Sequence, residues 1–149
     1  MLRLKKECFE EIKRQARESY PYECGGFLAG RNNSPRAAKE ITTVYPMKNL
    51  NSHQPRVRFE IDPKEFQRLE VEATKNGLQL LVFYHSHPDS PLRTNPSAFD
   101  RERAEGLSPF WPDLSYVIVS VNKGEEFEVA SWIFNSHIRR FEEEKVEIV

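Results

Sequence analysis

The sequence has few cysteines, almost no net charge and no long apolar stretch. Its longest apolar run, residues 80–84, is far shorter than the roughly 20 residues that a membrane-spanning helix needs. No apolar stretch follows the first charged residues, as a secretory signal would require, so we do not expect export. Lys and Arg number 22 against 23 Asp and Glu, and this balance gives no reason to expect binding to nucleic acid or to a membrane surface.

The cysteines and the length narrow the class of protein further. Cys8 and Cys24 allow one disulfide at most, and they lie in no zinc-knuckle spacing. We therefore expect two reduced thiols, buried and inert, in a cytoplasmic protein. The 149 residues contain no internal repeat and no low-complexity tract, and this length is typical of one domain with a substantial core.

Hydrophobic periodicity predicts helices that alternate with strands. Apolar residues, from Leu4 to Ala16, recur every four positions over residues 4–19, and Pro21 ends that helix. A second helix begins at Asp62 and ends at Gly77, and a short third helix covers about residues 97–105. The predicted strands cover residues 25–30, 41–46, 56–61, 78–84, 116–121 and 126–134, with a last edge strand from residue 138 onward. This order predicts an α/β fold, a central mixed β-sheet sandwiched by helices.

Three of the predicted strands carry further information. Glycine is concentrated in residues 25–30, which indicates that the backbone there approaches a neighbour closely. Apolar and charged residues alternate over residues 56–61, which predicts one buried face. Residues 78–84 are nearly all apolar, as expected of a central strand that is covered on both faces.

Two histidines follow this central strand, in the segment Tyr84-His85-Ser86-His87-Pro88. Side chains two apart in a strand point to the same face, so His85 and His87 present their imidazoles side by side. Imidazole is a good zinc ligand, and a catalytic zinc site commonly has three protein ligands and one open position. Asp100, on the first turn of the third helix, is the third ligand that the sequence offers.

Other interpretations of these residues stay open at this point. Ser97 and Asp100 also fit a helix capping signal, in which they do no more than begin a helix. Asp89 is a second candidate carboxylate, but it follows the second histidine by two residues across a proline and would need a very tight turn to reach the same ion. His53 and His137 lie in predicted loops and have no partner in the sequence.

Together these residues resemble the JAMM motif of the JAB/MPN metalloproteases: an upstream Glu, then His-x-His-Pro, a spacer and Ser-x-x-Asp. The matching residues are Glu23, His85-Ser86-His87-Pro88 and Ser97-Ala98-Phe99-Asp100. Residues 59–63, 100–104 and 115–120 are also similar to the small bacterial members, so the resemblance covers nearly the whole chain. The spacer between His87 and Ser97 has nine residues, two more than the common motif, and we expect the extra pair to loop out through residues 89–95.

The resemblance implies a single JAB/MPN metalloprotease domain over residues 1–149, with a cytidine-deaminase-like architecture. It implies one zinc ion per chain, bound by His85, His87 and Asp100. Glu23 would be the general base that takes a proton from water and passes it to the leaving amine, and Ser97 would donate a hydrogen bond to the oxyanion. The chain lacks the His-x-Glu and Pro-Cys-x-x-Cys motifs of the zinc deaminases themselves.

The function that the resemblance implies is a zinc-dependent isopeptidase or peptidase. It would hydrolyse the amide bond after the C-terminal Gly-Gly of a ubiquitin-like or sulfur-carrier protein, whose extended tail would lie beside the edge formed by residues 56–61. Two alternatives belong to other classes. One is a non-catalytic MPN-type scaffold, whose members typically lack the metal ligands, and the other is a zinc hydrolase of small amides.

Overall fold

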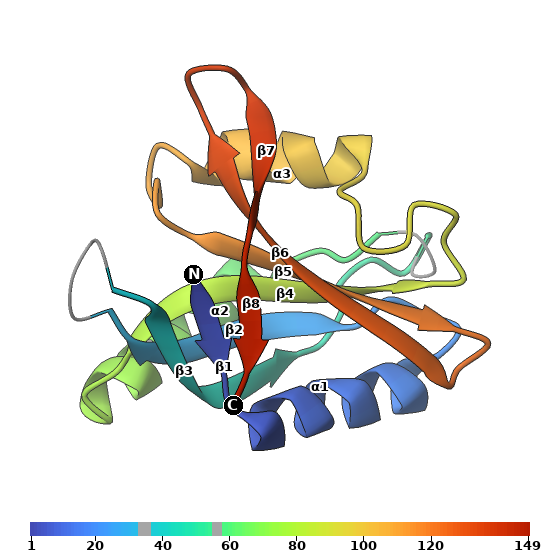
Figure 1. Cartoon of the computed structure of the whole chain (residues 1–149), viewed down its shortest axis with the longest axis horizontal. Coiled ribbons are helices and arrows are strands. Elements are labelled where there is room, and N and C mark those ends of the chain that lie inside the picture. Colours follow the sequence, from blue (N-terminus) through green and yellow to red (C-terminus); the bar gives the residue numbers. More distant parts are fainter. Residues whose placement is uncertain (33–36, 55–57) are drawn as a thin grey trace.

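The structure, a computed structural model, describes residues 1–32, 37–54 and 58–149. An eight-stranded mixed sheet in the order β7-β6-β5-β4-β2-β3-β1-β8 runs through it (Figure 1). The strands are β1 (Leu2–Leu4), β2 (Gly25–Arg31), β3 (Lys39–Met47), β4 (Gln79–Pro88), β5 (Ser115–Asn122), β6 (Glu126–Asn135), β7 (Arg140–Glu144) and β8 (Val146–Ile148). The helices are α1 (Lys6–Ser19), α2 (Pro63–Lys75) and α3 (Ala98–Leu107).

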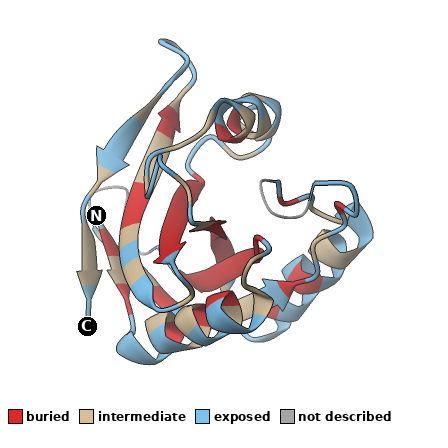
Figure 2. Cartoon of the chain, turned by 90° about the vertical axis from the view of Figure 1, so that its right-hand side faces the viewer, coloured by how far each residue is buried: buried red, intermediate tan, exposed pale blue. Residues whose placement is uncertain are grey.

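Helices cover the sheet on both faces, which confirms the predicted fold class. On one face, Cys8 and Ile12 of α1 pack into a core with sheet residues such as Leu28. On the other face, Leu69 of α2 and Ala104 of α3 belong to a second core, which contains Phe27, Phe83 and other sheet residues. Figure 2 shows that the buried residues follow the strands in the middle and the inner sides of the helices.

The central strands follow the sequence closely. Strand β4 is buried along most of its length, because it lies between β2 and β5 and is covered on both faces. Pro63 occupies the first turn of α2, the Asp62 carboxylate accepts a 3.0 Å hydrogen bond from the Lys64 backbone N–H, and Gly77 follows the helix with a φ of 70°. These local signals were sufficient to predict the helix.

Two predicted elements are wrong in part. Leu4 belongs to β1 rather than to the first helix, because Leu4 pairs with Ile41 on one side and Ile148 on the other. Such long-range pairing leaves no local signal. Of the strand predicted over residues 56–61, residues 56 and 57 lie outside the described residues, and residues 58–61 form no strand. Their burial still alternates, but the Asn49 side chain bonds the Arg58 carbonyl and the Glu60 N–H in place of a strand partner.

The two edge strands of the sheet follow one another directly in the sequence. Strands β7 and β8 lie at opposite ends of the order, yet only Lys145 separates them, so the sheet is strongly curled (Figure 1). A polar cluster lies beside this junction. Lys39 Nζ donates to Ser115 Oγ at 2.7 Å, and the hydroxyls of Ser115 and Ser131 each donate to Glu144 Oε1 at 2.8 Å. Burial lowers the pKa of Lys39.

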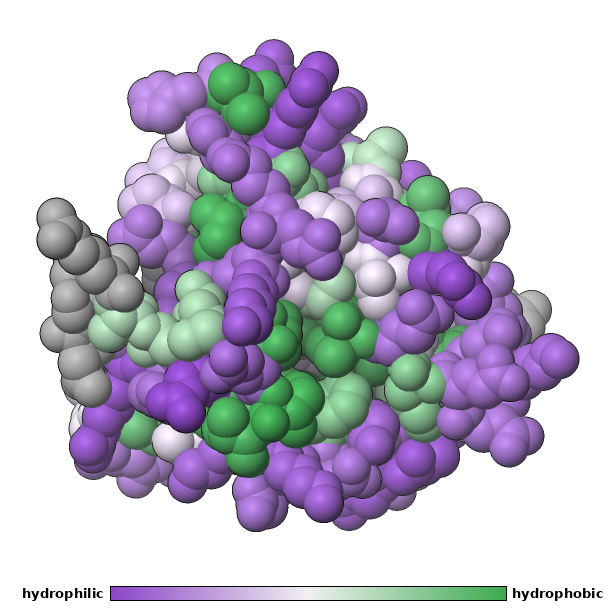
Figure 3. Space-filling model, viewed as in Figure 1, coloured by the Kyte–Doolittle hydropathy of each residue, from purple (hydrophilic) through white to green (hydrophobic). Residues whose placement is uncertain are grey.

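Hydrophilic side chains cover most of the face seen in Figure 3. Below the centre of the face that carries both termini, apolar side chains gather (Figure 3). Met1, Ile148 and Val149 are among the exposed hydrophobic residues of the chain. No helix in the described part of the chain is long and apolar enough to cross a membrane.

The glycines of β2 allow the close approach that the sequence predicted, and this can be tested. A Cβ atom at Gly30 would overlap the backbone oxygen of Glu40 on β3. We expect Gly30→Ala to lower the free energy of unfolding by at least about 2 kcal/mol, since the backbone of β3 would have to shift. Gly106 is the matched control, because a Cβ there meets nothing within 4 Å, and Gly106→Ala should stabilise α3 by about 0.5–1 kcal/mol. Chemical denaturation measures both changes, and equal midpoints for the two variants would contradict the packing described.

Candidate active site

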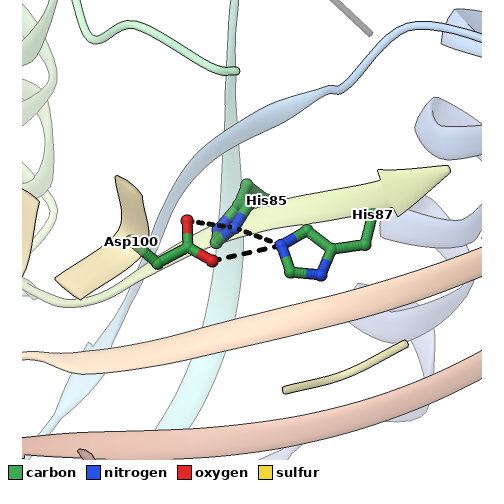
Figure 4. Close-up of side chains that lie close together, drawn as sticks. All are labelled: His85, His87 and Asp100. Carbon is green, nitrogen blue, oxygen red and sulfur yellow. Dashed lines mark hydrogen bonds and ion pairs between the residues drawn. The ribbon is translucent and has the colours of Figure 1, made fainter. Parts of the chain in front are cut away.

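Three side chains from two elements converge beside the end of the central strand (Figure 4). His85 and His87 lie on β4, and Asp100 lies in the first turn of α3. The Asp100 carboxylate reaches both rings, with Oδ1 3.0 Å from His85 Nε2 and Oδ2 3.2 Å from His87 Nε2. The two Nε2 atoms are 3.1 Å apart, and all three side chains are buried.

This geometry fits a metal ion. The ligand atoms of the three residues all lie within 4.8 Å of one another. In a tetrahedral site with bonds of about 2.0–2.1 Å, neighbouring ligand atoms are about 3.3 Å apart, close to the separations found here. Two imidazoles and one carboxylate are also a donor set suited to a divalent cation of intermediate softness. The structure therefore brings together the three residues that the sequence proposed as ligands.

The surrounding backbone orients the second histidine. His87 Nδ1 lies 2.7 Å from the carbonyl oxygen of Arg93, in the loop between β4 and α3. In the neutral ring, a proton on Nδ1 is donated to this carbonyl, and Nε2 then carries the lone pair that a metal ion would bind. The ring of His85 stacks on Phe83, with the ring centroids 5.5 Å apart.

The three groups differ in their protonation. Complete burial lowers the pKa of His85 to about 4, so this imidazole is neutral. Burial would also lower the pKa of His87, but the hydrogen bond and charge of Asp100 outweigh it and raise that pKa. Burial opposes ionisation of Asp100, yet the two histidines hold its pKa well below the usual range, so the carboxylate is charged. A cation at this site would therefore meet the negative charge of Asp100 and the neutral imidazole of His85.

The register between β2 and β4 brings Glu23 to the same place. The two strands are antiparallel, Gly25 pairs with His85, and the Ser86 N–H donates to the Cys24 carbonyl at 2.9 Å. Glu23, the next residue outward, is buried. Burial raises its pKa to about 8, against the attraction of His87. A nearby cation would favour its charged form.

Cys24 and Cys8 form no disulfide with each other. Both are buried free thiols, and burial raises the pKa of each to about 11. Few thiolates exist at neutral pH under such conditions. The prediction of two buried free thiols is confirmed, and their lack of reactivity stays a prediction.

Ser97 caps α3, as one of the two sequence interpretations has it. Its hydroxyl accepts a hydrogen bond from the Asp100 N–H at 3.1 Å, and Asp100 Oδ2 accepts one from the Ser97 N–H at 2.8 Å. This capping box fixes the carboxylate that contacts the histidines. Ser97 therefore both caps α3 and lies next to the proposed metal ligand Asp100.

The remaining candidates lie elsewhere. The Asp89 carboxylate accepts hydrogen bonds from the Tyr20 hydroxyl and, at 2.7 Å, from the Lys123 N–H, so it does not share the cluster with Asp100. His53 and His137 are exposed loop residues. Neither belongs to the cluster of possible metal ligands found among the described residues.

Sequence reasoning missed Arg103. Its side chain is 9% exposed, Nη1 lies 3.5 Å from Asp100 Oδ1, and Nη2 donates to the Phe59 carbonyl. Its guanidinium also lies over the rings of Phe83 and Phe99, at 4.7 and 5.0 Å from their centroids. Arg103 therefore fastens the segment before α2 to the carboxylate of the site. Its spacing of three from Asp100, on the same side of a helix, was the available signal.

Comparison with known proteins agrees with this geometry. The model of the family described as prokaryotic homologs of the JAB domain matches residues 5–135. A desampylase from Haloferax volcanii is 39% identical over 101 residues, which cover 67% of this chain and 63% of that protein. A probable TtuB-protein conjugate cleaving protease from Thermus thermophilus is 30% identical over 87 residues, 58% of this chain and 53% of that protein. The chain thus spans less than two thirds of the length of either relative.

A solved structure shares the whole fold. The solution structure of a protein from Desulfitobacterium hafniense superposes with a TM-score of 0.83 at 32% sequence identity, covering 100% of this chain and 93% of that one. The family match extends over most of the chain and includes every residue of the cluster described above. The chain belongs to the prokaryotic homologs of the JAB domain.

Proposed function

We propose that this protein is a zinc-dependent metallo-isopeptidase. It hydrolyses the amide bond that follows the C-terminal Gly-Gly of a ubiquitin-like or sulfur-carrier protein. The names of two relatives, a desampylase and a probable TtuB-protein conjugate cleaving protease, support a substrate of this kind.

One observation carries the proposal. Two imidazole nitrogens and a carboxylate converge within 4.8 Å beside a buried glutamate whose pKa is raised to about 8. A general base is most effective when its pKa is close to the working pH, and buried carboxylates in such surroundings are typical of catalytic sites. A scaffold that only binds partners has no need of this arrangement.

His85, His87 and Asp100 would hold the zinc ion. When bound, zinc supplies Lewis acidity, which brings the pKa of a water molecule from 15.7 to about 7 and polarises a carbonyl. The remaining chemistry belongs to the chain itself.

Glu23 accepts the proton of the attacking water and then donates it to the leaving amine. Burial favours its protonated form, so the proton is held for the second transfer. The Ser97 hydroxyl donates a hydrogen bond to the oxyanion that forms on the attacked carbonyl, because its own acceptor role in the helix cap leaves its proton available. Arg103 holds the Asp100 carboxylate in position through the 3.5 Å contact between Nη1 and Oδ1.

The substrate prediction is tested with a carrier protein. A ubiquitin-like carrier with a C-terminal Gly-Gly, fused through it to one amino acid, should be cleaved at that bond, whereas fusions with Ala-Ala or Val-Val in place of Gly-Gly should not. Glycine has no side chain, so an extended tail ending in Gly-Gly can approach the site where the side chains of Ala or Val would collide with it. Mass spectrometry of the released carrier measures the cleavage. Equal cleavage of all three fusions, or faster hydrolysis of free dipeptides, would favour a hydrolase of small amides.

The ligand set is tested by metal content. We expect one zinc ion per chain, lost in His85→Ala and His87→Ala and held more weakly in Asp100→Ala, as measured by elemental analysis. Asp89→Asn is the control, because its carboxylate bonds Tyr20 and Lys123 instead. Loss of metal in that variant, with retention in Asp100→Ala, would show that the ligand set is wrong.

The role of Glu23 is tested by removing its proton transfer alone. Glu23→Gln should keep the zinc and lose about 10²–10⁴-fold in turnover, the usual contribution of a general acid–base group. Gln has the size of Glu but cannot accept the proton. Glu7→Gln, an exposed position in the first turn of α1, makes the same change away from the cluster and should retain full turnover. Normal turnover in Glu23→Gln would remove the residue from the mechanism.

A further inference from the structure

A groove lies directly beside Ser97, between the start of α3 and the β6–β7 hairpin. It has a volume of about 480 Å³, and its walls include Pro96, Ser97, Arg101, Trp132, Arg140 and Phe141. A second hollow of about 320 Å³, near the hairpin turn, shares Arg101 and Arg140 with this groove. At the top of Figure 3, where Figure 1 places this turn, hydrophilic side chains surround a small apolar spot. Of the residues assigned to the proposed reaction, Ser97 lines this groove.

Two positive charges in the groove have no partner of opposite charge. Arg101 and Arg140 are exposed, and within the described ranges neither side chain takes part in an ion pair or hydrogen bond. Arg139 differs, since its guanidinium makes two 3.1 Å bonds to the carboxylate of Glu105. The groove thus carries two available guanidinium groups in a protein whose net charge is −1.

Two aromatic side chains also line the groove. Trp132 and Phe141 are half-buried. The indole N–H of Trp132 donates to the Thr94 carbonyl at 2.8 Å, so its one polar group is already used and the ring adds apolar surface. The same bond fastens the loop that leads to Ser97 onto β6. A preformed wall of this kind costs little conformational entropy when a ligand binds.

We propose that this groove binds a polypeptide segment of the conjugate that carries carboxylate side chains next to the scissile bond. The inference rests on the proposed function, because only the role of Ser97 relates the groove to the scissile bond. Guanidinium groups pair with carboxylates through parallel hydrogen bonds, and aromatic walls accommodate peptide planes and apolar side chains. Single-stranded nucleic acid also binds arginines and aromatic rings, but the net charge of −1 and the sequence pI of 6.4 disfavour it.

The test measures binding rather than turnover. Labelled peptides with the sequence Gly-Gly-Glu-Ala-Glu and Gly-Gly-Gln-Ala-Gln are titrated with zinc-loaded Glu23→Gln protein, and fluorescence anisotropy gives the dissociation constants. Arg101→Gln with Arg140→Gln should weaken binding of the acidic peptide about tenfold, as expected for two exposed ion pairs. Binding of the Gln peptide should not change. Arg14→Gln with Arg31→Gln, two exposed arginines outside the groove, is the matched control and should change neither.

Several outcomes would overturn the proposal. An equal loss for both peptides would show that the arginines act through packing, and an equal loss in the control pair would show an effect of net charge alone. Tighter binding of an oligothymidine than of the acidic peptide, lost in the same groove variant, would make the ligand a nucleic acid. Since no step here depends on cleavage, failure of the carrier fusion to react would overturn the proposed function and leave this binding result intact.

A second pair of peptides determines whether the groove binds the carrier, before the scissile bond, or the released group, after it. Glu-Ala-Glu-Gly-Gly-Ala carries its carboxylates before the Gly-Gly, and Gly-Gly-Glu-Ala-Glu carries them after it. A larger loss for the first peptide in the groove variant supports the proposal and assigns the groove to the carrier. A larger loss for the second supports it and assigns the groove to the released group. No loss for either peptide would refute the proposal.

Discussion

The antiparallel pairing of β2 with β4 is the constraint on which the site depends. It sets Gly25 opposite His85 and carries Glu23 to the side of the cluster, although Glu23 and His85 are 62 positions apart in the chain. The pairing needs unusually small residues. A side chain at Gly25 would meet the Tyr84 backbone on β4, and one at Gly26 would meet the Tyr84 ring as well as the backbone of Tyr45 on β3. The glycines therefore affect the chemistry indirectly, because they let the backbones of β2 and β4 lie close enough to bring Glu23 beside the histidines.

Much of the site could be predicted because its signals are local. The His-x-His spacing on a strand and the Ser-x-x-Asp spacing at a helix start each fix a geometry within a few residues. The position of Arg103 depends instead on which side of α3 faces Phe59 and Phe83, and that is decided by packing. The strand predicted at residues 56–61 failed for a similar reason. Its alternating burial is real where described, but the side chain of Asn49 takes up backbone groups that a strand would use.

The site is held by polar groups that each have two functions. Asp100 bonds both histidines and the N–H of Ser97, so one carboxylate belongs to the cluster and to the helix cap. The loop before it is fixed at two consecutive carbonyls, that of Arg93 by His87 and that of Thr94 by Trp132. Such shared contacts make the ligand atoms rigid, because moving one of them would break several hydrogen bonds at once.

The place of β1 in the sheet affects how the protein is made. This strand lies between β3 and β8, and Leu2 pairs with Lys39 on one side and Val146 on the other. A contact so distant in sequence forms late and slows folding. On a ribosome that adds about 5–20 residues per second, the outer edge of β1 waits roughly 7–30 s for its partner. Until then the nascent chain exposes one edge of β1 that β8 covers in the finished protein.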